Sequence, residues 1–190
     1  MEREWVVEES VAIEASASDV YAAVADPRRM REWSPEVFAA WVRGRTIAPG
    51  TRFVGFNRIG WRVWFTTCQV TAAVPGEAFA FRVSSFGVPV ALWGYRIEEI
   101  AGQDDTGQDG ASQDDAGQDG AGQDGAEGGS GPRTRLTEYW EDQRRDNRGA
   151  AFVSLLGRLF TGVPAGRRAA VNRDGMRATL DRIRTATEKG

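Results

Sequence analysis

Hydrophobic and polar positions alternate along the first stretch of the chain, "EWVVEESVAIEA". Val7, Val11 and Ile13 fall on one side of an extended backbone, and Glu9 falls on the same side. A period of two residues is typical of a β-strand that is buried on one face. The pattern therefore predicts an opening strand with a carboxylate among its inward-facing positions.

Two short helices are predicted after this strand, in "SASDVYAAVADPRRMREW". Ser16 and Asp19 resemble a helix-capping box, in which a side-chain oxygen accepts from a free backbone N–H. Asp26 can cap a second helix, with Pro27 at its first position, where a missing N–H costs nothing. A Ser-Pro pair then ends this helix directly after Trp33. We expect the second helix to lie across the mouth of a cavity, with Trp33 pointing inward.

Six further strand-like runs follow, with turn signals at Pro49-Gly50, Ile59-Gly60 and Pro75-Gly76. The short spacing between the runs favours an antiparallel meander. The second and third runs are apolar on both faces, so alternation does not decide which of their faces points inward. The six runs are EVFAAWVRGR, TRFVGFNRI, WRVWFTTCQVTAAV, AFAFRVSS, VPVALWGYRIEEI and TRLTEYWEDQRR.

The C-terminal part has the spacing of helices. Apolar residues at helical intervals over 152–160 predict one helix, for which packing on the domain is favoured over binding to a membrane surface. A longer helix is predicted roughly over 167–188, with Met176, Leu180 and Ile183 on one face.

Five copies of an acidic pentapeptide occupy residues 102–126, within a segment, 102–131, that carries seven Asp, one Glu and no Lys or Arg. Such a composition cannot bury a core, so we expect a disordered loop insertion. Calcium binding is the alternative, because aspartate oxygens suit Ca²⁺. A loop is favoured, because no bulky apolar residue recurs. Without the segment the formal charge is 24 minus 19, or +5.

Composition excludes several kinds of site. The chain has no histidine and one cysteine, Cys68, which rules out Ser-His-Asp and Cys-His catalysis, histidine-ligated metals and an internal disulfide. We therefore expect no metal and no cofactor. The body charge is too small for a nucleic-acid-binding protein, and no apolar run is long enough for membrane insertion. With no signal peptide visible, a cytoplasmic protein is expected, and a homodimer stays open.

The ordered set of stretches resembles the polyketide cyclase/dehydrase and lipid transport family of the START-like (SRPBCC) superfamily, which is related to plant pathogenesis-related protein 10. The resemblance implies a single helix-grip domain over 1–190, of the α+β class. In that fold a curved antiparallel sheet, here of about seven strands, wraps around a long C-terminal helix and an apolar cavity. The stretches are DVYAAVADPRRMREWSPEV, GTRFVGFNRIG, PGEAFAFRV, ALWGYRIEEI, TRLTEYWEDQR and GMRATLDRI.

A cavity of this kind is mostly apolar, with a few polar groups that orient the ligand. Asn57 and Thr66 could orient a carbonyl or hydroxyl group of the ligand, although Asn57 is equally explained by the turn before Gly60. Each of the other candidates is about as well explained as plain core. The candidates are Trp33, Phe38, Trp41, Phe53, Asn57, Trp64, Thr66, Phe81, Trp93, Tyr95, Trp140, Met176 and Leu180.

Two functions of different class remain open. The first is the binding or transport of a hydrophobic small molecule, such as a lipid, a polyketide or an aromatic metabolite. The second is a polyketide aromatase/cyclase, which would need a proton acceptor and a donor beside the substrate. Without histidine, the candidates are Glu9 and Glu138, assisted by Tyr95. We favour binding, because each carboxylate is better explained by contact with solvent or an arginine. A buried carboxylate within hydrogen-bonding reach of a cavity hydroxyl would favour the enzyme.

Overall fold

The computed structural model describes residues 4–100, 131–144 and 165–189. The pentapeptide repeat and the helix predicted over 152–160 lie outside the described residues.

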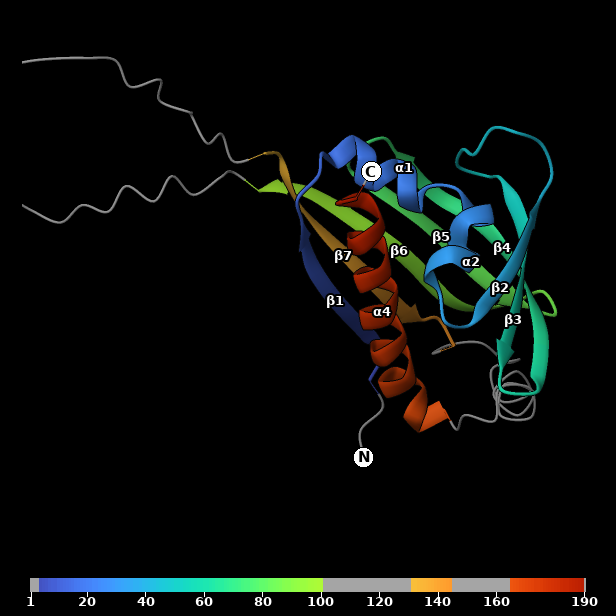
Figure 1. The fold of residues 1–190 in the computed structure, drawn as a ribbon. Helices are drawn as coiled ribbons and strands as arrows, with labels where there is room; N and C mark the ends of the chain where they lie inside the picture. Colours follow the sequence, from blue (N-terminus) through green and yellow to red (C-terminus); the bar gives the residue numbers. More distant parts are fainter. Residues whose placement is uncertain (1–3, 101–130, 145–164, 190) are drawn as a thin grey trace, which may run out of the picture.

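Seven strands of the described residues form one antiparallel sheet, in the order β1-β7-β6-β5-β4-β3-β2 (Figure 1). Strands that follow each other in the chain are neighbours from β2 to β7, and β1 completes the sheet by pairing with β7. The predicted α+β helix-grip arrangement is confirmed. The strands are β1 Val6–Ile13, β2 Val37–Val42, β3 Arg52–Ile59, β4 Arg62–Val74, β5 Ala78–Ser85, β6 Val88–Ile100 and β7 Arg133–Asp142.

The turn between β3 and β4 is a tight hairpin. Ile59 pairs with Arg62, so Gly60 and Trp61 form its two-residue tip. Gly60 has a φ of 58°, a conformation that glycine adopts without the steric cost of a side chain. The hairpin therefore holds the Trp61 side chain at one end of the sheet.

Both predicted helix caps between β1 and β2 are present. The Ser16 hydroxyl accepts a hydrogen bond from the Asp19 N–H at the start of α1 (Ala17–Val24). The Asp26 carboxylate accepts from the Arg28 N–H and caps a 3-10 turn, η1 (Pro27–Arg29), which continues into α2 (Met30–Trp33). The second predicted helix thus combines one 3-10 turn and one α-helical turn.

The long C-terminal helix, α4 (Ala165–Thr187), crosses the inner face of the sheet and contacts β1, β7, α1 and α2 (Figure 1). Met176, Leu180 and Ile183 are buried, as the helical stripe predicts. Asn172 and Thr179 are also buried on this helix, at 3% and 4% exposure. Two polar side chains therefore face the domain interior from α4.

The structure decides which faces of the doubly apolar strands point inward. On β3, Phe53 and Asn57 are buried, whereas Phe56 is partly exposed. On β4, Trp64 and Thr66 line the interior, whereas Phe65 is 56% exposed. The aromatic residues of these strands are thus divided between the core side and the outer surface.

No helix within the described ranges is both long enough and apolar enough to cross a bilayer.

Candidate ligand cavity

A cavity of about 140 Å³ lies between the inner face of the sheet, the segment from Met30 to Val37 and the N-terminal half of α4. An apolar cavity of about 150 Å³ in another protein holds benzene. The space therefore suits one ring, or a ring-sized part of a larger molecule. Its lining is Met30, Trp33, Ser34, Pro35, Glu36, Val37, Phe53, Gly55, Asn57, Trp64, Thr66, Cys68, Phe81, Val83, Trp93, Tyr95, Glu138, Arg168, Val171, Asn172, Gly175 and Thr179.

Most of the candidate residues from the sequence meet at this cavity. They come from α2 and from strands β3 to β7, so the antiparallel order brings distant stretches of the chain together. Those that line it are Trp33, Phe53, Asn57, Trp64, Thr66, Phe81, Trp93, Tyr95 and Glu138.

Three other candidates are core residues outside the lining. Trp140 and Met176 are 4% and 1% exposed and belong to a separate apolar cluster with Val7. Leu180 is 3% exposed and packs in the main core. All three lie where α4 closes on the sheet, so their side chains are covered by protein.

Phe38 and Trp41 are the remaining aromatic candidates, and they lie on the opposite side of the sheet. Trp41 is 59% exposed and Phe38 is 44% exposed. The register shift between Val37 and Ala39 in the pairing with β3 explains the orientation of Phe38, because a bulge interrupts the alternation of faces.

Glu9 is held outside the cavity by arginines of α4. Its Oε1 lies 3.2 Å from Arg173 Nε, and its Oε2 accepts a hydrogen bond from Arg177 Nε at 3.1 Å. Glu9 therefore pairs with arginines, which is the alternative to a catalytic role that the sequence left open for this carboxylate.

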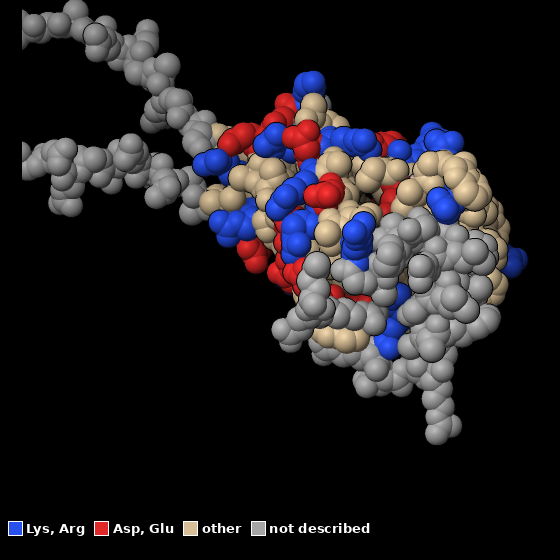
Figure 2. Space-filling model, turned by 90° about the horizontal axis from the view of Figure 1, so that it is seen from below, with Lys and Arg blue, Asp and Glu red and all other residues tan. Residues whose placement is uncertain are grey.

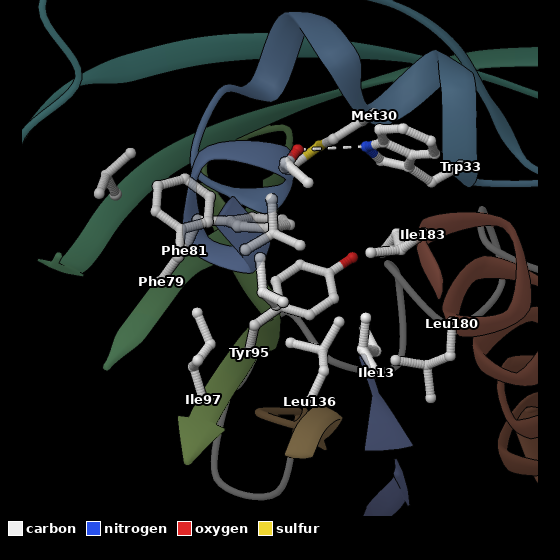
Figure 3. Close-up of a cluster of buried hydrophobic side chains, with 14 of the residues drawn as sticks. Ile13, Met30, Trp33, Phe79, Phe81, Tyr95, Ile97, Leu136, Leu180 and Ile183 are labelled. Atoms are coloured by element: carbon white, nitrogen blue, oxygen red, sulfur yellow. Dashed lines mark hydrogen bonds between the residues drawn. The ribbon is translucent and has the colours of Figure 1, made fainter. Parts of the chain in front are cut away.

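Trp33 lines the cavity but is packed as a core residue. Its side chain is 6% exposed, and its indole N–H donates a hydrogen bond of 3.2 Å to the Ala23 carbonyl oxygen (Figure 3). The Arg29 guanidinium lies 5.0 Å from the ring centroid. Trp33 therefore points inward, and its ring both joins α2 to α1 and borders the cavity. That α2 lies across the mouth of the cavity stays a prediction.

Glu138 and Tyr95 form a buried pair in the cavity wall. They occupy facing positions on β7 and β6, and the Tyr95 hydroxyl donates to Glu138 Oε1 at 3.3 Å. Burial raises the pKa of Glu138 from 4.5 to about 8, although the hydrogen bond from Tyr95 acts in the opposite direction. Burial also raises the pKa of Tyr95. At neutral pH, both groups are therefore predominantly protonated.

Four buried polar atoms of the cavity lining have no hydrogen-bond partner among the described residues: Glu138 Oε2, Arg168 Nη1 and both amide atoms of Asn172. Arg168 is held in place through its other terminal nitrogen, which donates to Glu36 at 2.8 Å. Among the described residues, one further buried polar atom lacks a hydrogen bond, Arg133 Nε. It lies outside the cavity, 2.7 Å from a carboxylate oxygen of Glu14, with which it forms an ion pair. The unsatisfied hydrogen-bonding capacity is thus concentrated in the cavity.

Asn172 and Arg168 were not among the candidates from the sequence. Asn172 lies four residues before Met176 on the predicted apolar stripe of α4, so continuing the stripe by one turn would have found it. Arg168 lies one further turn toward the N-terminus.

A second polar chain crosses the cavity wall between β3 and β4. The Asn57 amide donates to the Gly55 carbonyl oxygen at 3.2 Å and to the Thr66 hydroxyl at 3.4 Å. Thr66 lies 3.8 Å from the Cys68 sulfur, and burial raises the pKa of this thiol to about 12. Cys68 is therefore a neutral thiol, and Asn57, unlike Asn172, has partners within the protein.

The described residues contain no group of three or more Cys, Asp and Glu side chains arranged to hold a metal ion.

Comparison with known sequences decides the family. The model of the family described as polyketide cyclase/dehydrase and lipid transport matches residues 4–188. The chain belongs to this family. No curated protein sequence matches it.

Solved structures share this fold. A polyketide-cyclase-like protein from Corynebacterium glutamicum is 25% identical, with a TM-score of 0.55, and the match covers 99% of this chain and 94% of that one. A START superfamily protein from Mycobacterium smegmatis is 11% identical, with a TM-score of 0.60 and coverages of 98% and 99%. The di-domain ARO/CYC protein StfQ from the steffimycin biosynthetic pathway is 11% identical, with a TM-score of 0.57 and coverages of 97% and 51%.

Proposed function

We propose that this protein binds a small molecule with a hydrophobic body and at least one polar group in the cavity under α4. The observation that carries the proposal is the set of unpartnered polar atoms on Glu138, Arg168 and Asn172. A buried polar atom without a partner costs roughly 1–3 kcal/mol. A ligand that supplies the missing partners would recover this free energy on binding.

The rest of the lining suits the hydrophobic part of such a molecule. Trp64 and Trp93 contribute large, partly buried rings, and Phe53 and Phe81 pack edge to face with their centroids 5.3 Å apart. An aromatic wall with few polar groups is the usual composition of a small-molecule pocket. The volume favours an aromatic metabolite, or the ring-sized part of a polyketide or lipid. The family description, which includes lipid transport, supports this class of ligand.

The first test is to identify small molecules that stay bound through purification. The protein is denatured in organic solvent, and the released compounds are identified by mass spectrometry. We expect a compound with an apolar ring or chain and a polar group, in stoichiometric amount. The Asn172→Leu variant, purified in the same way, should carry less of it. Equal amounts released from both proteins would remove Asn172 from the binding site.

A matched pair of variants separates ligand binding from ordinary stability. Asn172→Leu removes two unpartnered atoms, so the ligand-free protein should gain roughly 1–3 kcal/mol of unfolding free energy. Asn57→Leu removes an amide that donates to Gly55 and Thr66, so it should lose stability. Opposite signs in chemical denaturation would support a binding role for Asn172. A loss of stability in both variants would indicate that Asn172 is a structural residue.

The Glu138–Tyr95 pair favours a second candidate, a polyketide aromatase/cyclase-type enzyme. It is a buried carboxylate within hydrogen-bonding distance of a cavity hydroxyl, the feature that distinguishes an enzyme from a carrier. With a pKa of about 8, Glu138 would donate a proton at neutral pH and accept one in alkaline solution. The structural likeness to StfQ shows the fold alone, so the chemistry of the pair carries this candidate.

A poly-ketone substrate analogue distinguishes the two candidates. The full-length protein and its Glu138→Gln variant are incubated with the analogue, and cyclised products are measured by chromatography. An enzyme predicts product formation that is lost in the variant. A carrier predicts that the analogue binds and is recovered unchanged from both proteins.

A further inference from the structure

The outer face of the sheet carries a group of exposed or partly exposed hydrophobic side chains on β2, β3 and β4 and in the β3–β4 and β5–β6 turns. Among them, Trp61 is 82% exposed, Phe86 64% and Phe65 56%. The rings of Phe65 and Phe86 lie 6.4 Å apart, and those of Phe38 and Phe56 lie 6.3 Å apart. We refer to this group as the outer aromatic patch. Its members are Phe38, Trp41, Phe56, Trp61, Val63, Phe65 and Phe86.

Two arginines, Arg58 and Arg62, lie over aromatic rings of this patch, and Glu32 and Glu36 line the same surface hollow as Phe38 and Arg58. Three other arginines of this part of the chain lie toward the opposite end of β3: Arg43, Arg45 and Arg52. Residues 37–76 contain five arginines and no Lys, Asp or Glu, a formal charge of +5. The Arg58 guanidinium lies 5.8 Å from the Phe38 ring centroid, and that of Arg62 lies 4.5 Å from the Trp61 ring centroid. None of the five forms an ion pair with a carboxylate of the described residues. The five are Arg43, Arg45, Arg52, Arg58 and Arg62.

Several arginines elsewhere in the fold pair with carboxylates. On α4, Arg168 pairs with Glu36, and Arg173 pairs with Glu4 and Glu9. On β6, Arg96 pairs with Glu8 at 2.7 Å. Figure 2 shows blue and red intermixed over the left and centre of the described surface. Arg58 and Arg62 therefore have no carboxylate partner among the described residues, a property they share with Arg31, Arg82 and Arg182.

The patch and the cavity share the same strands. On β4, Val63 and Phe65 point outward, and Trp64 between them lines the cavity. On β3, Arg58 is exposed, and its neighbour Asn57 lines the cavity. The exposed hairpin therefore lies on the strands that form the cavity wall.

We propose that the outer aromatic patch docks the protein on the surface of a lipid bilayer that contains anionic lipids. Trp61, Phe65 and Phe86 enter the interfacial layer, where aromatic side chains with an apolar body are favoured. Arg58 and Arg62 contact lipid phosphates, which arginine recognises through paired N–H donors. The docking does not depend on the ligand of the cavity.

Two features favour a bilayer over other occupants. A second copy of the chain docked through this patch would bring Arg58 and Arg62 of both copies together, and like charges oppose such an interface. Trp61 and Phe86 lie in the β3–β4 and β5–β6 turns, so they project from the ends of strands and can enter an interface. An acidic protein partner is the outcome that the test is designed to distinguish.

The test is co-sedimentation of the full-length protein with vesicles of phosphatidylcholine alone, or mixed with phosphatidylglycerol, at low salt. We expect binding to the mixed vesicles, weakened by added salt. One basic side chain near an anionic surface contributes roughly a five-fold change in binding. The Arg58→Glu/Arg62→Glu variant should therefore bind at least about 25-fold more weakly. Trp61→Ser should also bind more weakly, and since Trp61 lies in an exposed turn, this variant should fold.

Lys189→Glu and Val6→Ser are the matched controls, because Lys189 and Val6 are exposed residues away from the patch. Both should bind like the unmodified protein. Lipids brominated on their acyl chains should quench the tryptophan fluorescence of the unmodified protein more than that of Trp61→Phe. The proposal is overturned if the protein does not bind the mixed vesicles. Binding to an acidic protein or to a second copy of the chain would not rescue it. Equal binding by the patch variants and the controls would overturn it as well.

Discussion

Replacing Glu138 by glutamine should change how stability depends on pH. The side chain is 5% exposed and lies in the cavity wall beside Tyr95. Burial raises the pKa of the folded-state carboxyl from 4.5 to about 8. Glutamine has nearly the same shape, can accept the Tyr95 hydrogen bond and does not titrate. The variant therefore removes the titration and largely preserves the packing.

The sign of the effect follows from proton linkage. Between the two pKa values, the folded protein keeps the proton of Glu138 and the unfolded chain has released it. Stability therefore falls as pH rises from 4.5 to about 8, and this contribution is constant above and below that window. A rise of about three pH units within the window corresponds to a loss of roughly 4 kcal/mol. Glu138→Gln should not show this loss.

The assay is urea denaturation of ligand-free protein at several pH values across the window, with the unmodified protein and the variant measured in parallel. The two should differ least at about pH 5, and the advantage of the variant should grow by about 1 kcal/mol or more per pH unit. Glu141→Gln is the matched control, because Glu141 is an exposed carboxylate on the same strand. Its stability should follow that of the unmodified protein.

A constant difference between Glu138→Gln and the unmodified protein at every pH would refute this reasoning. It would mean that the carboxylate ionises normally in the folded protein, so the cavity would have to admit water. The proton-donor role of Glu138 in the enzyme candidate would then fail as well.

Three further predictions concern the packing and the loop insertion that the sequence predicts. Trp33→Ala should lose about 3–5 kcal/mol of unfolding free energy in chemical denaturation. The loss should exceed that of Trp93→Ala, because Trp93 is partly exposed. A smaller loss for Trp33→Ala than for Trp93→Ala would indicate that Trp33 lies at the cavity mouth and is not a core residue. Gly94→Ala should lower the unfolding free energy by about 1–3 kcal/mol, since the added Cβ would overlap the Tyr139 ring. If Gly94→Ala costs as much in a Tyr139→Ala background, another contact is responsible. Deleting residues 102–131 should leave one cooperative thermal transition, because loop-closure entropy changes slowly with length; loss of cooperativity would contradict the domain assignment.

The sequence was sufficient for the order of the described elements, because each signal was local. Alternation predicted β1, and the runs AFAFRVSS and VPVALWGYRIEEI correspond to β5 and β6 as found. The oxygen of Ser16 and that of Asp26 cap the helices that they were expected to cap. Such features depend on neighbours a few residues away, which a single sequence contains.

The cavity was less predictable, because its lining depends on how α4 crosses the sheet. Alternation places Trp140 and Tyr95 on the same inner face, but α4 covers Trp140 and leaves Tyr95 beside empty space. Phe38 points outward beside a bulge in β2, and Glu9 pairs with two arginines of α4 outside the cavity. Each of these outcomes depends on contacts between elements far apart in the chain.

A crystal structure of the protein with the compound that it retains through purification would test the central claim most directly. The account predicts an organic molecule in the cavity under α4, with a polar group within hydrogen-bonding distance of the Asn172 amide or of Glu138 Oε2. A compound bound elsewhere would contradict the account. So would a cavity in which ordered water alone satisfies these atoms.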